Sequence, residues 1–238
     1  MLMLGLFSKG IRLPEAGLFD GFTDAHTHVL PGVDDGVQTI AESLSILDKY
    51  QQMGVKSVIL TPHIMEDIPN TTDALKLRFA ELEAAYSGPL ILYLASENMI
   101  DGLFDERLEK NDFLPMPGKR LLVETSYYTA PIDLLGRLDK VRSAGYFPVM
   151  AHPERYMYME MSDYVKIKGL GVQFQLNIPS VLGMYGPEAL GKAYKLIDMG
   201  YYDFVGTDIH SERLVHHLVE DKTDKKRIQK VCRLHYPF

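Results

Sequence analysis

Cysteine is almost absent from this sequence of 238 residues, which contains only Cys232. One cysteine cannot build a disulfide framework within the chain, so the expected compartment is a reducing one, the cytoplasm. For the same reason, the sequence does not support a structural zinc site built from several thiolates.

Long apolar runs are also missing. The start, MLMLGLFSKG, is apolar for about seven residues, which is too short for a signal-peptide core or a membrane span. The 25 Lys and Arg residues are outnumbered by 32 Asp and Glu, and the net charge of −7 argues against a nucleic-acid-binding surface. No repeat, low-complexity segment or linker divides the chain. We therefore predict one domain over residues 21–238, preceded by an N-terminal arm of residues 1–20.

What is present is a regular alternation of strand-like and helix-like segments, in a chain that is 46% hydrophobic. Apolar, β-branched runs predict seven strands, at 21–26, 55–63, 89–98, 119–126, 146–156, 171–177 and 201–210. Helical spacing of apolar residues predicts helices at 38–54, 72–86, 103–110, 131–145, 159–169 and 186–200, and from about residue 212 onward. Buried strands that alternate with helices indicate an α/β fold with a parallel sheet, so we expect a closed β/α barrel, with an open doubly wound sheet as the alternative.

Polar residues follow these strands at equivalent places. They are His26, His28, His63, Glu97, Glu124, His152, Asp208 and His210, and Asp34 and Asp35 lie in a glycine-flanked loop after the first strand. The strand ends of a β/α barrel converge on one rim, so we expect these side chains to share a cleft. Residues two apart on a strand point to one side, so His26 and His28 can reach the same ion.

The donor set contains imidazoles and carboxylates but no thiolate, which suits manganese, iron or zinc. Nine donors are too many for one ion and predict two or three divalent ions. The predicted ligands are His26, His28, Asp35, His63, Glu97, Glu124, His152, Asp208 and His210.

The ordered motifs DAHTH, DDG, TPH, VE, AHPERY and DIH resemble those of the PHP (polymerase and histidinol phosphatase) superfamily. HTHVLPGVDDG and AHPERY resemble, within it, the capsule-associated protein-tyrosine phosphatases of CpsB type in bacteria. The resemblance implies a distorted (β/α)7 TIM-like barrel, the PHP fold, with a trinuclear centre in which manganese is expected and iron or zinc are alternatives.

The resemblance also implies roles for single residues. One ion would bind His26, His28, Glu124 and Asp208; a second would share Glu124 and add His152 or a neighbour; a third would involve Asp35, His63, Glu97 and His210. Arg155 and Arg213 would bind phosphate, and His210 is a further candidate for catalysis. Four tyrosines follow predicted strands and would either surround the phenyl ring of a substrate or pack at the rim of the barrel. They are Tyr127, Tyr128, Tyr156 and Tyr158.

The implied activity is metal-dependent hydrolysis of phosphotyrosine in proteins, opposing a tyrosine kinase in capsular or exopolysaccharide synthesis. The partner would be the tail of that kinase, and homo-oligomerisation is left open. A small-molecule phosphatase of the histidinol-phosphatase type is the alternative, and a regulatory metal-binding module without turnover is a third reading. A cysteine-based phosphatase is excluded, because Cys232 is followed by RLHYPF and has no arginine at the sixth place.

Overall fold

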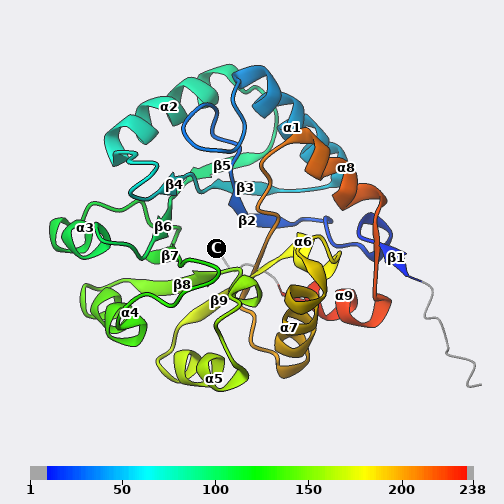
Figure 1. Ribbon diagram of the computed structural model, residues 1–238. Coiled ribbons are helices and arrows are strands. Elements are labelled where there is room, and N and C mark those ends of the chain that lie inside the picture. The colour runs from blue at the N-terminus through cyan, green and yellow to red at the C-terminus, as the bar shows by residue number, and fades with distance from the viewer. Residues whose placement is uncertain (1–9, 235–238) are drawn as a thin grey trace, which may run out of the picture.

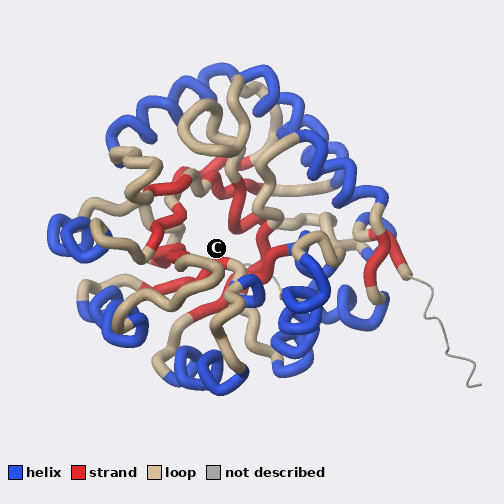
Figure 2. Tube along the Cα trace, viewed as in Figure 1, coloured by secondary structure: helices blue, strands red, loops and turns tan. Residues whose placement is uncertain are grey.

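The computed structural model describes residues 10–234 of the chain. Its strands surround the centre of the molecule and its helices lie outside them (Figure 2). A six-stranded parallel sheet runs in the order β10 (Phe204–Gly206), β9 (Gln173–Asn177), β8 (Phe147–Ala151), β7 (Arg120–Glu124), β6 (Glu97–Met99) and β4 (His63–Ile64). A three-stranded parallel sheet runs in the order β2 (Thr23–Thr27), β3 (Ser57–Leu60) and β5 (Ile91–Leu94).

Chain continuity and one bridge connect the two sheets. β3 continues into β4 after a break of two residues, and β5 continues into β6 in the same way. On the other side, β2 meets the segment after β10 through a parallel bridge between Thr27 and Ile209. There the backbone N–H of Asp208 donates to His26 O at 2.8 Å, and that of His28 donates to Ile209 O at 2.9 Å. These bonds connect β2, the first of the parallel strands, to the segment after β10, the last of them.

The helices that cover the strands are α1 (Ile40–Met53), α2 (Thr72–Ala85), α3 (Phe104–Lys110), α4 (Leu134–Ser143), α5 (Met161–Gly169), α6 (Ile178–Val181), α7 (Gly186–Met199), α8 (Glu212–Glu220) and α9 (Lys225–Val231) (Figure 1). There are also two short helices: η1 (Pro14–Ala16) precedes β2, and η2 (Pro153–Arg155) follows β8. Local sequence sets the boundaries: the Thr39 hydroxyl accepts the N–H of Glu42 at the start of α1, and Gly54 ends it with φ of 94°. α2 is capped by Thr71, whose hydroxyl accepts the N–H of Ala74.

The core consists of two groups of buried apolar side chains. The larger group packs between the strands and the helices. The smaller group lies among the strands and contains Ala25, Ile59, Ala95, Met116, Leu122, Val149, Ala151 and Phe204. Because this smaller group takes residues from both sheets, it holds the two sheets together beneath the polar strand ends.

The prediction of an α/β fold with parallel strands is confirmed. Hydrogen bonding divides the parallel strands between two sheets, so a single closed barrel of seven β/α units remains a prediction. The division of the chain into an arm of residues 1–20 and a domain of residues 21–238 also remains a prediction. Part of the predicted arm, residues 1–9, lies outside the described residues, and within the rest Leu13 and Phe19 are buried.

One expectation about the C-terminal region is wrong. The chain from residue 212 onward is not helical throughout, because β11 (Lys222–Thr223) separates α8 from α9. β11 pairs antiparallel with β1 (Ile11–Arg12), a strand the sequence pattern did not predict. Strands of two residues are too short to show the alternation from which strands are predicted.

Candidate metal centre

Nine histidine, aspartate and glutamate side chains gather around the ends of β2, β7, β8 and β10 and the starts of β4 and β6, the short strands that continue β3 and β5. They are His26, His28, Asp35, His63, Glu97, Glu124, His152, Asp208 and His210. Each belongs to at least one group of three or four residues whose ligand atoms lie within 4.8 Å of one another. The structure therefore brings together all nine side chains that the sequence places after its strands and in the first loop.

Glu97 lies at the centre of this cluster. Its Oε2 is 3.1 Å from His26 Nε2 and 3.3 Å from His28 Nε2. The same oxygen is 3.2 Å from His63 Nδ1, while Oε1 is 2.9 Å from His152 Nε2. A fully buried carboxylate that reaches four imidazoles is suited to bridge neighbouring ions.

Two other carboxylates complete the buried part of the cluster. Asp208 Oδ1 is 3.3 Å from His28 Nε2 and 3.5 Å from His26 Nε2. Glu124 Oε1 is 3.0 Å from His63 Nδ1. Both carboxylates are buried, so each must be compensated by positive charge or by hydrogen bonds.

The cluster opens to solvent at Asp35. Its Oδ1 is 3.5 Å from both His63 Nε2 and His210 Nε2, and its side chain is 66% exposed. The imidazoles of His28 and His210 stack here with ring centroids 4.0 Å apart. A substrate therefore has access to the cluster from the side of Asp35 and His210.

Hydrogen bonds fix the orientation of two of the histidine rings, those of His26 and His28. His26 Nδ1 donates to Gln175 Oε1 at 2.8 Å, and His28 Nδ1 donates to Asp34 Oδ2 at 2.9 Å. Each bond leaves Nε2 of the ring directed at Glu97 and Asp208. A histidine that donates one ring N–H to an oxygen and directs the other nitrogen at carboxylates is arranged as metal-binding histidines are.

Local backbone geometry brings these groups close together. The pairing of β2 with β3 shifts register between Asp24 and Thr27, a local irregularity of the kind that redirects side chains next to active sites. Gly206 lies so close to His26 that a Cβ there would be 2.5 Å from the histidine Cβ. His152 and Asp208 have φ of 30° and 52°, in the left-handed region that residues other than glycine rarely adopt. Such strain is maintained by the surrounding structure and is common at functional sites.

Opposite charges govern the protonation of the cluster. Burial alone would lower the pKa of His26, but the carboxylates of Glu97 and Asp208 raise that pKa to about 9. Burial alone would raise the pKa of Asp208, but the adjacent His26 holds it well below its usual value. A hydrogen bond from His210 lowers the pKa of Asp35 to about 2. In the protein alone, protons on the imidazoles thus balance the carboxylates, and cations can replace those protons.

Two observations support the fit of the cluster to divalent metal ions. The first is the spacing of its ligand atoms. Ligands that are each about 2.1 Å from one ion lie roughly 3.0–3.4 Å apart in octahedral or tetrahedral geometry. The distance of 3.0 Å between His26 Nε2 and His28 Nε2 lies in that range. Second, His63 Nδ1 and Glu124 Oε1 are buried and 3.0 Å apart, yet neither has a hydrogen-bond partner among the described residues.

The two predicted phosphate-binding arginines differ in position. Arg155 ends η2, and its Nη1 donates to Asp208 Oδ2 at 2.9 Å. Its guanidinium lies between two aromatic rings, 4.2 Å from the centroid of Tyr127 and 4.0 Å from that of Tyr185. Arg213 is exposed in the first turn of α8, and no hydrogen bond or ion pair joins it to the cluster within residues 10–234.

A cavity of about 170 Å³ adjoins Arg155. We call it the slot, and its lining residues are Tyr127, Tyr128, Arg155, Met157, Tyr185 and Ala189. Of the tyrosines predicted near the rim, Tyr127 and Tyr128 line the slot, whereas Tyr156 is fully buried and its hydroxyl donates to Ala151 O at 2.9 Å. Tyr156 is therefore a packing residue, and Tyr158 lies outside the slot.

The grouping of donors differs from the one that the resemblance implies. Glu97, and not Glu124, lies next to both His26 and His28 and also reaches His152. Glu124 groups with His63 and Glu97, and its Oε2 also lies 3.9 Å from His152 Nε2. Sequence spacing places all these groups at strand ends but does not determine which side chain extends farthest toward the centre.

Sequence reasoning missed several residues that position the donors. Gln175 was not predicted, and Asp34 was noted only as a neighbouring carboxylate. Asp24 was also missed: it accepts hydrogen bonds from Tyr50 Oη at 2.8 Å and Thr207 Oγ1 at 2.7 Å, which joins β2 to the segment after β10. The only available signal was their position, since Asp24 is two residues before His26 and Gln175 is inside a predicted strand.

Comparison with known proteins gives a consistent set of relatives. The family model described as "Capsular polysaccharide synthesis, CpsB/CapC" matches residues 22–230. The tyrosine-protein phosphatase YwqE of Bacillus subtilis is 25% identical over 199 residues, covering 79% of this chain and 77% of YwqE. The tyrosine-protein phosphatase CpsB of Streptococcus agalactiae is 27% identical over 208 residues, covering 79% of this chain and 82% of CpsB.

Solved structures support the fold. A structure from the work on YwqE of Bacillus subtilis and CpsB of Streptococcus pneumoniae, described as metal-dependent tyrosine phosphatases, matches with a TM-score of 0.69 at 24% identity. The match covers 87% of this chain and 84% of that one. The phosphotriesterase homology protein of Escherichia coli matches with a TM-score of 0.50 at 14% identity, covering 85% and 87% of the two chains. Over residues 10–234, no helix is both long enough and apolar enough to cross a membrane.

Proposed function

This chain belongs to the CpsB/CapC family of capsular polysaccharide synthesis proteins, and from that premise we propose that it is a metal-dependent phosphatase that hydrolyses phosphotyrosine in a polypeptide. One observation carries the proposal: nine candidate metal-ligand side chains converge within reach of Arg155, a half-buried arginine next to an aromatic slot. Relatives named as tyrosine-protein phosphatases support the same activity.

The nine clustered side chains would hold two or three divalent ions, with manganese first and iron or zinc as alternatives. Glu97 would be shared between ions, because it belongs to two of the donor groups. Ions bound there would activate water for hydrolysis and neutralise the charge of the phosphate. With three ions, the charge of +6 exceeds that of the carboxylates Asp35, Glu97, Glu124 and Asp208 by two, which suits a phosphate dianion in an otherwise acidic protein.

Arg155 would bind the phosphate and stabilise charge on its oxygens during transfer. A guanidinium presents five N–H donors in a planar fork that matches phosphate geometry. One of its nitrogens is held by Asp208, and the two flanking tyrosine rings prevent the group from rotating freely. The fixed orientation means that little reorganisation is needed when charge develops. Arg213 is a second candidate for the same role, supported by the resemblance alone.

The slot would bind the phenyl ring of the substrate. Its volume of about 170 Å³ and its walls of Tyr127, Met157 and Tyr185 suit an aromatic ring whose phosphate reaches Arg155. A phenolate leaving group has a pKa near 10, so its departure needs less proton donation than that of an alkoxide. His210, at the open edge of the cluster, is the candidate imidazole for any proton that is required.

An open outer wall favours a polypeptide over a metabolite. Tyr128 lines the slot but is 79% exposed, so the slot is not closed around a small molecule. We extend the proposal to a tyrosine kinase tail as the partner, to a cytoplasmic location, and to a distorted (β/α)7 barrel in which the two sheets act as one. Residues 21–238 would form this domain, with residues 1–20 as its arm.

The test compares two substrates on the metal-loaded protein. The proposal predicts a much higher kcat/KM for a phosphotyrosine peptide than for histidinol phosphate. The reverse order would assign the protein to the small-molecule phosphatases. Metal binding without phosphate release from either substrate would assign it to non-catalytic metal-binding modules.

A further inference from the structure

A second cavity lies between α4 and α5, close to the candidate metal centre. We propose that this cavity, called here the groove, binds an apolar side chain of the polypeptide that carries the phosphotyrosine. The inference rests on the proposed function and deepens it, because it assigns sequence preference around the phosphotyrosine to a defined surface. Nothing in the chemistry of phosphate hydrolysis itself requires such a surface.

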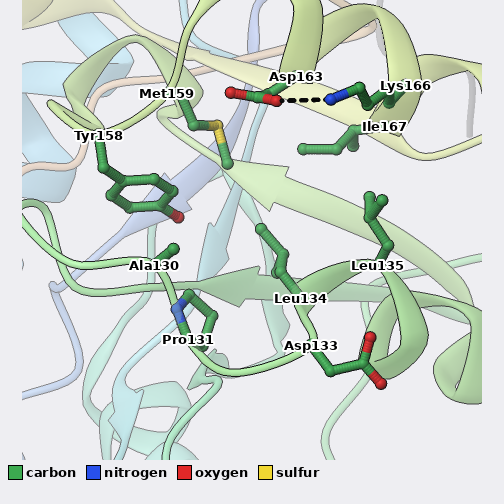
Figure 3. Close-up of a pocket in the computed structure, with 10 residues that line it drawn as sticks. All are labelled: Ala130, Pro131, Asp133, Leu134, Leu135, Tyr158, Met159, Asp163, Lys166 and Ile167. Atoms are coloured by element: carbon green, nitrogen blue, oxygen red, sulfur yellow. Dashed lines mark hydrogen bonds and ion pairs between the residues drawn. The ribbon is translucent and has the colours of Figure 1, made fainter.

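The groove is large, apolar and ready to accept a side chain. Its volume is about 450 Å³, and the residues that line it include Ala130, Pro131, Leu134, Leu135, Met159 and Ile167. Figure 3 shows the side chains of Leu134, Met159 and Ile167 facing a common space, with charged groups at its margin. Those groups are Asp133 and the ion pair between Asp163 and Lys166, in which Asp163 Oδ1 lies 3.2 Å from Lys166 Nζ. An apolar interior with a charged margin is the composition of a side-chain pocket.

The groove adjoins the slot because the same two loops line both. In the loop after β7, Tyr128 lines the slot and Ala130 lines the groove. In the loop after β8, Met157 lines the slot and Met159 lines the groove. Two residues of extended chain span at most about 7 Å. The two cavities are therefore neighbouring parts of one surface, not separate features of the molecule.

Hydrogen bonds connect these loops to each other and to the metal centre. The N–H of Met157 donates to Tyr127 O at 2.7 Å, which joins the two loops. The hydroxyls of Tyr158 and Thr125 are 2.7 Å apart, and Thr125 directly follows the donor Glu124. The wall of the groove thus has a fixed position relative to the cluster, so a side chain bound in the groove would help to place a phosphate at the ions.

Exposed apolar side chains continue from the slot to the groove. Tyr128 is 79% exposed, Ile132 is 87% exposed and Leu135 is 41% exposed, all within eight residues of the chain. Neighbouring exposed apolar side chains mark interaction surfaces when they lie together. A substrate in extended conformation advances about 3.3 Å per residue, so the residue in the groove would be one to three positions from the phosphotyrosine.

The experiment measures selectivity on the full, metal-loaded chain. Phosphotyrosine peptides carry either Leu or Ser at each position from three before to three after the phosphotyrosine, one change at a time. We expect one position where Leu raises kcat/KM by about tenfold over Ser, the usual effect of a filled apolar pocket. Leu135→Ser removes part of the groove and Ala130→Trp fills it; both positions are exposed, so folding is preserved. In both variants the Leu-to-Ser ratio should fall to about one.

Because the readout is a ratio, any general loss of activity cancels. Leu77→Ser is the matched control: Leu77 is 71% exposed on α2, on the far side of the molecule from α4 and α5 (Figure 1), and the ratio should not change. A ratio of one at every position in the unaltered protein, or a preference that survives both groove variants, would overturn the proposal. So would a change in oligomeric state with Leu135→Ser and an unchanged ratio, since the groove would then bind a second copy.

Failure of the proposed function has a different result. If the metal-loaded protein releases no phosphate from these peptides or from p-nitrophenyl phosphate, both proposals fail together. If it hydrolyses p-nitrophenyl phosphate and the peptides without sequence preference, only the assignment of the groove is wrong.

Discussion

Oε1 of Gln175 accepts a hydrogen bond of 2.8 Å from Nδ1 of His26, a buried member of the cluster of candidate metal ligands. An amide oxygen can only accept, so the proton is on Nδ1 and Nε2 is free to face Glu97 and Asp208. The same Gln175 oxygen lies 3.3 Å from the backbone N of His152, so one side chain positions two of the candidate ligands.

This relationship makes Gln175 a positioning residue for metal binding. Gln175→Ala should weaken metal affinity by about 10- to 100-fold, the usual loss when a hydrogen bond to a ligating histidine is removed. Gln175→Glu keeps an acceptor at the same place and should restore most of the affinity. Competition with a chromogenic chelator measures both. Gln173→Ala, at the less buried start of β9, is the control, and an equal loss there would show that the effect is general destabilisation.

Arg155 is expected to act through the geometry of its guanidinium. Arg155→Ala should lower kcat/KM on a phosphotyrosine peptide by about a hundredfold or more, as for other groups that stabilise transition-state charge. Arg155→Lys should recover little, because an ammonium lacks the planar fork and the stacking between Tyr127 and Tyr185.

Two controls accompany the arginine variants. Arg142→Ala removes an exposed arginine that pairs with Asp139 on α4 and should leave kcat/KM unchanged. Metal content must be measured alongside, since Arg155 also holds Asp208. Full activity of Arg155→Lys with normal metal content would refute a bidentate role for this arginine.

The metal-free protein should lose stability as pH rises. His26 has its pKa raised from 6.5 to about 9, so its contribution is complete below pH 6.5 and disappears as pH rises through 9. The loss in the free energy of unfolding is at most about 3 kcal/mol. Metal binding should show the opposite trend and tighten over the same range, because ions must displace the imidazole protons. Urea unfolding of chelated and metal-loaded protein at pH 6.5 and 9 measures both, and equal stability of the chelated form at the two values would contradict the charge balance described for the cluster.

Cys232 should have no part in turnover. Its Sγ donates to Ala16 O at 3.5 Å, and burial raises the pKa of the thiol, which disfavours the nucleophilic thiolate. Cys232→Ser should therefore leave phosphate release from p-nitrophenyl phosphate unchanged. Loss of turnover in a correctly folded Cys232→Ser protein would mean that a cysteine, and not the metal cluster, supplies the nucleophile.

Much of the fold could be predicted because several strands, such as β3 and β5, are mainly apolar runs and the helices have clear ends. Gly54 illustrates this, since it stops α1 where the sequence pattern ends. The pairing of β1 with β11 could not be predicted, because it depends on contacts between residues more than 200 positions apart in the chain. Division of the strands into two sheets likewise depends on register shifts and breaks that single-sequence patterns do not record.

For the site, the types and positions of the donors could be predicted, but their grouping could not. His63 begins β4 and Glu124 ends β7, and their side-chain separation of 3.0 Å depends on how far these two strands extend toward the centre, which the sequence does not record. The role of Gln175 was hidden for a related reason: a glutamine inside a strand gives no sign of the histidine across the sheet. Residues that act on the substrate are conspicuous in sequence, while those that position them become visible only in three dimensions.

The central claim is that the strand-end side chains hold metal ions, and a crystal of the manganese-loaded protein tests it most directly. An anomalous difference map collected at the manganese edge should show two or three peaks around Glu97, each within bonding distance of at least three of the nine donors. Absence of any peak near Glu97, with the donors paired only to one another, would contradict the account.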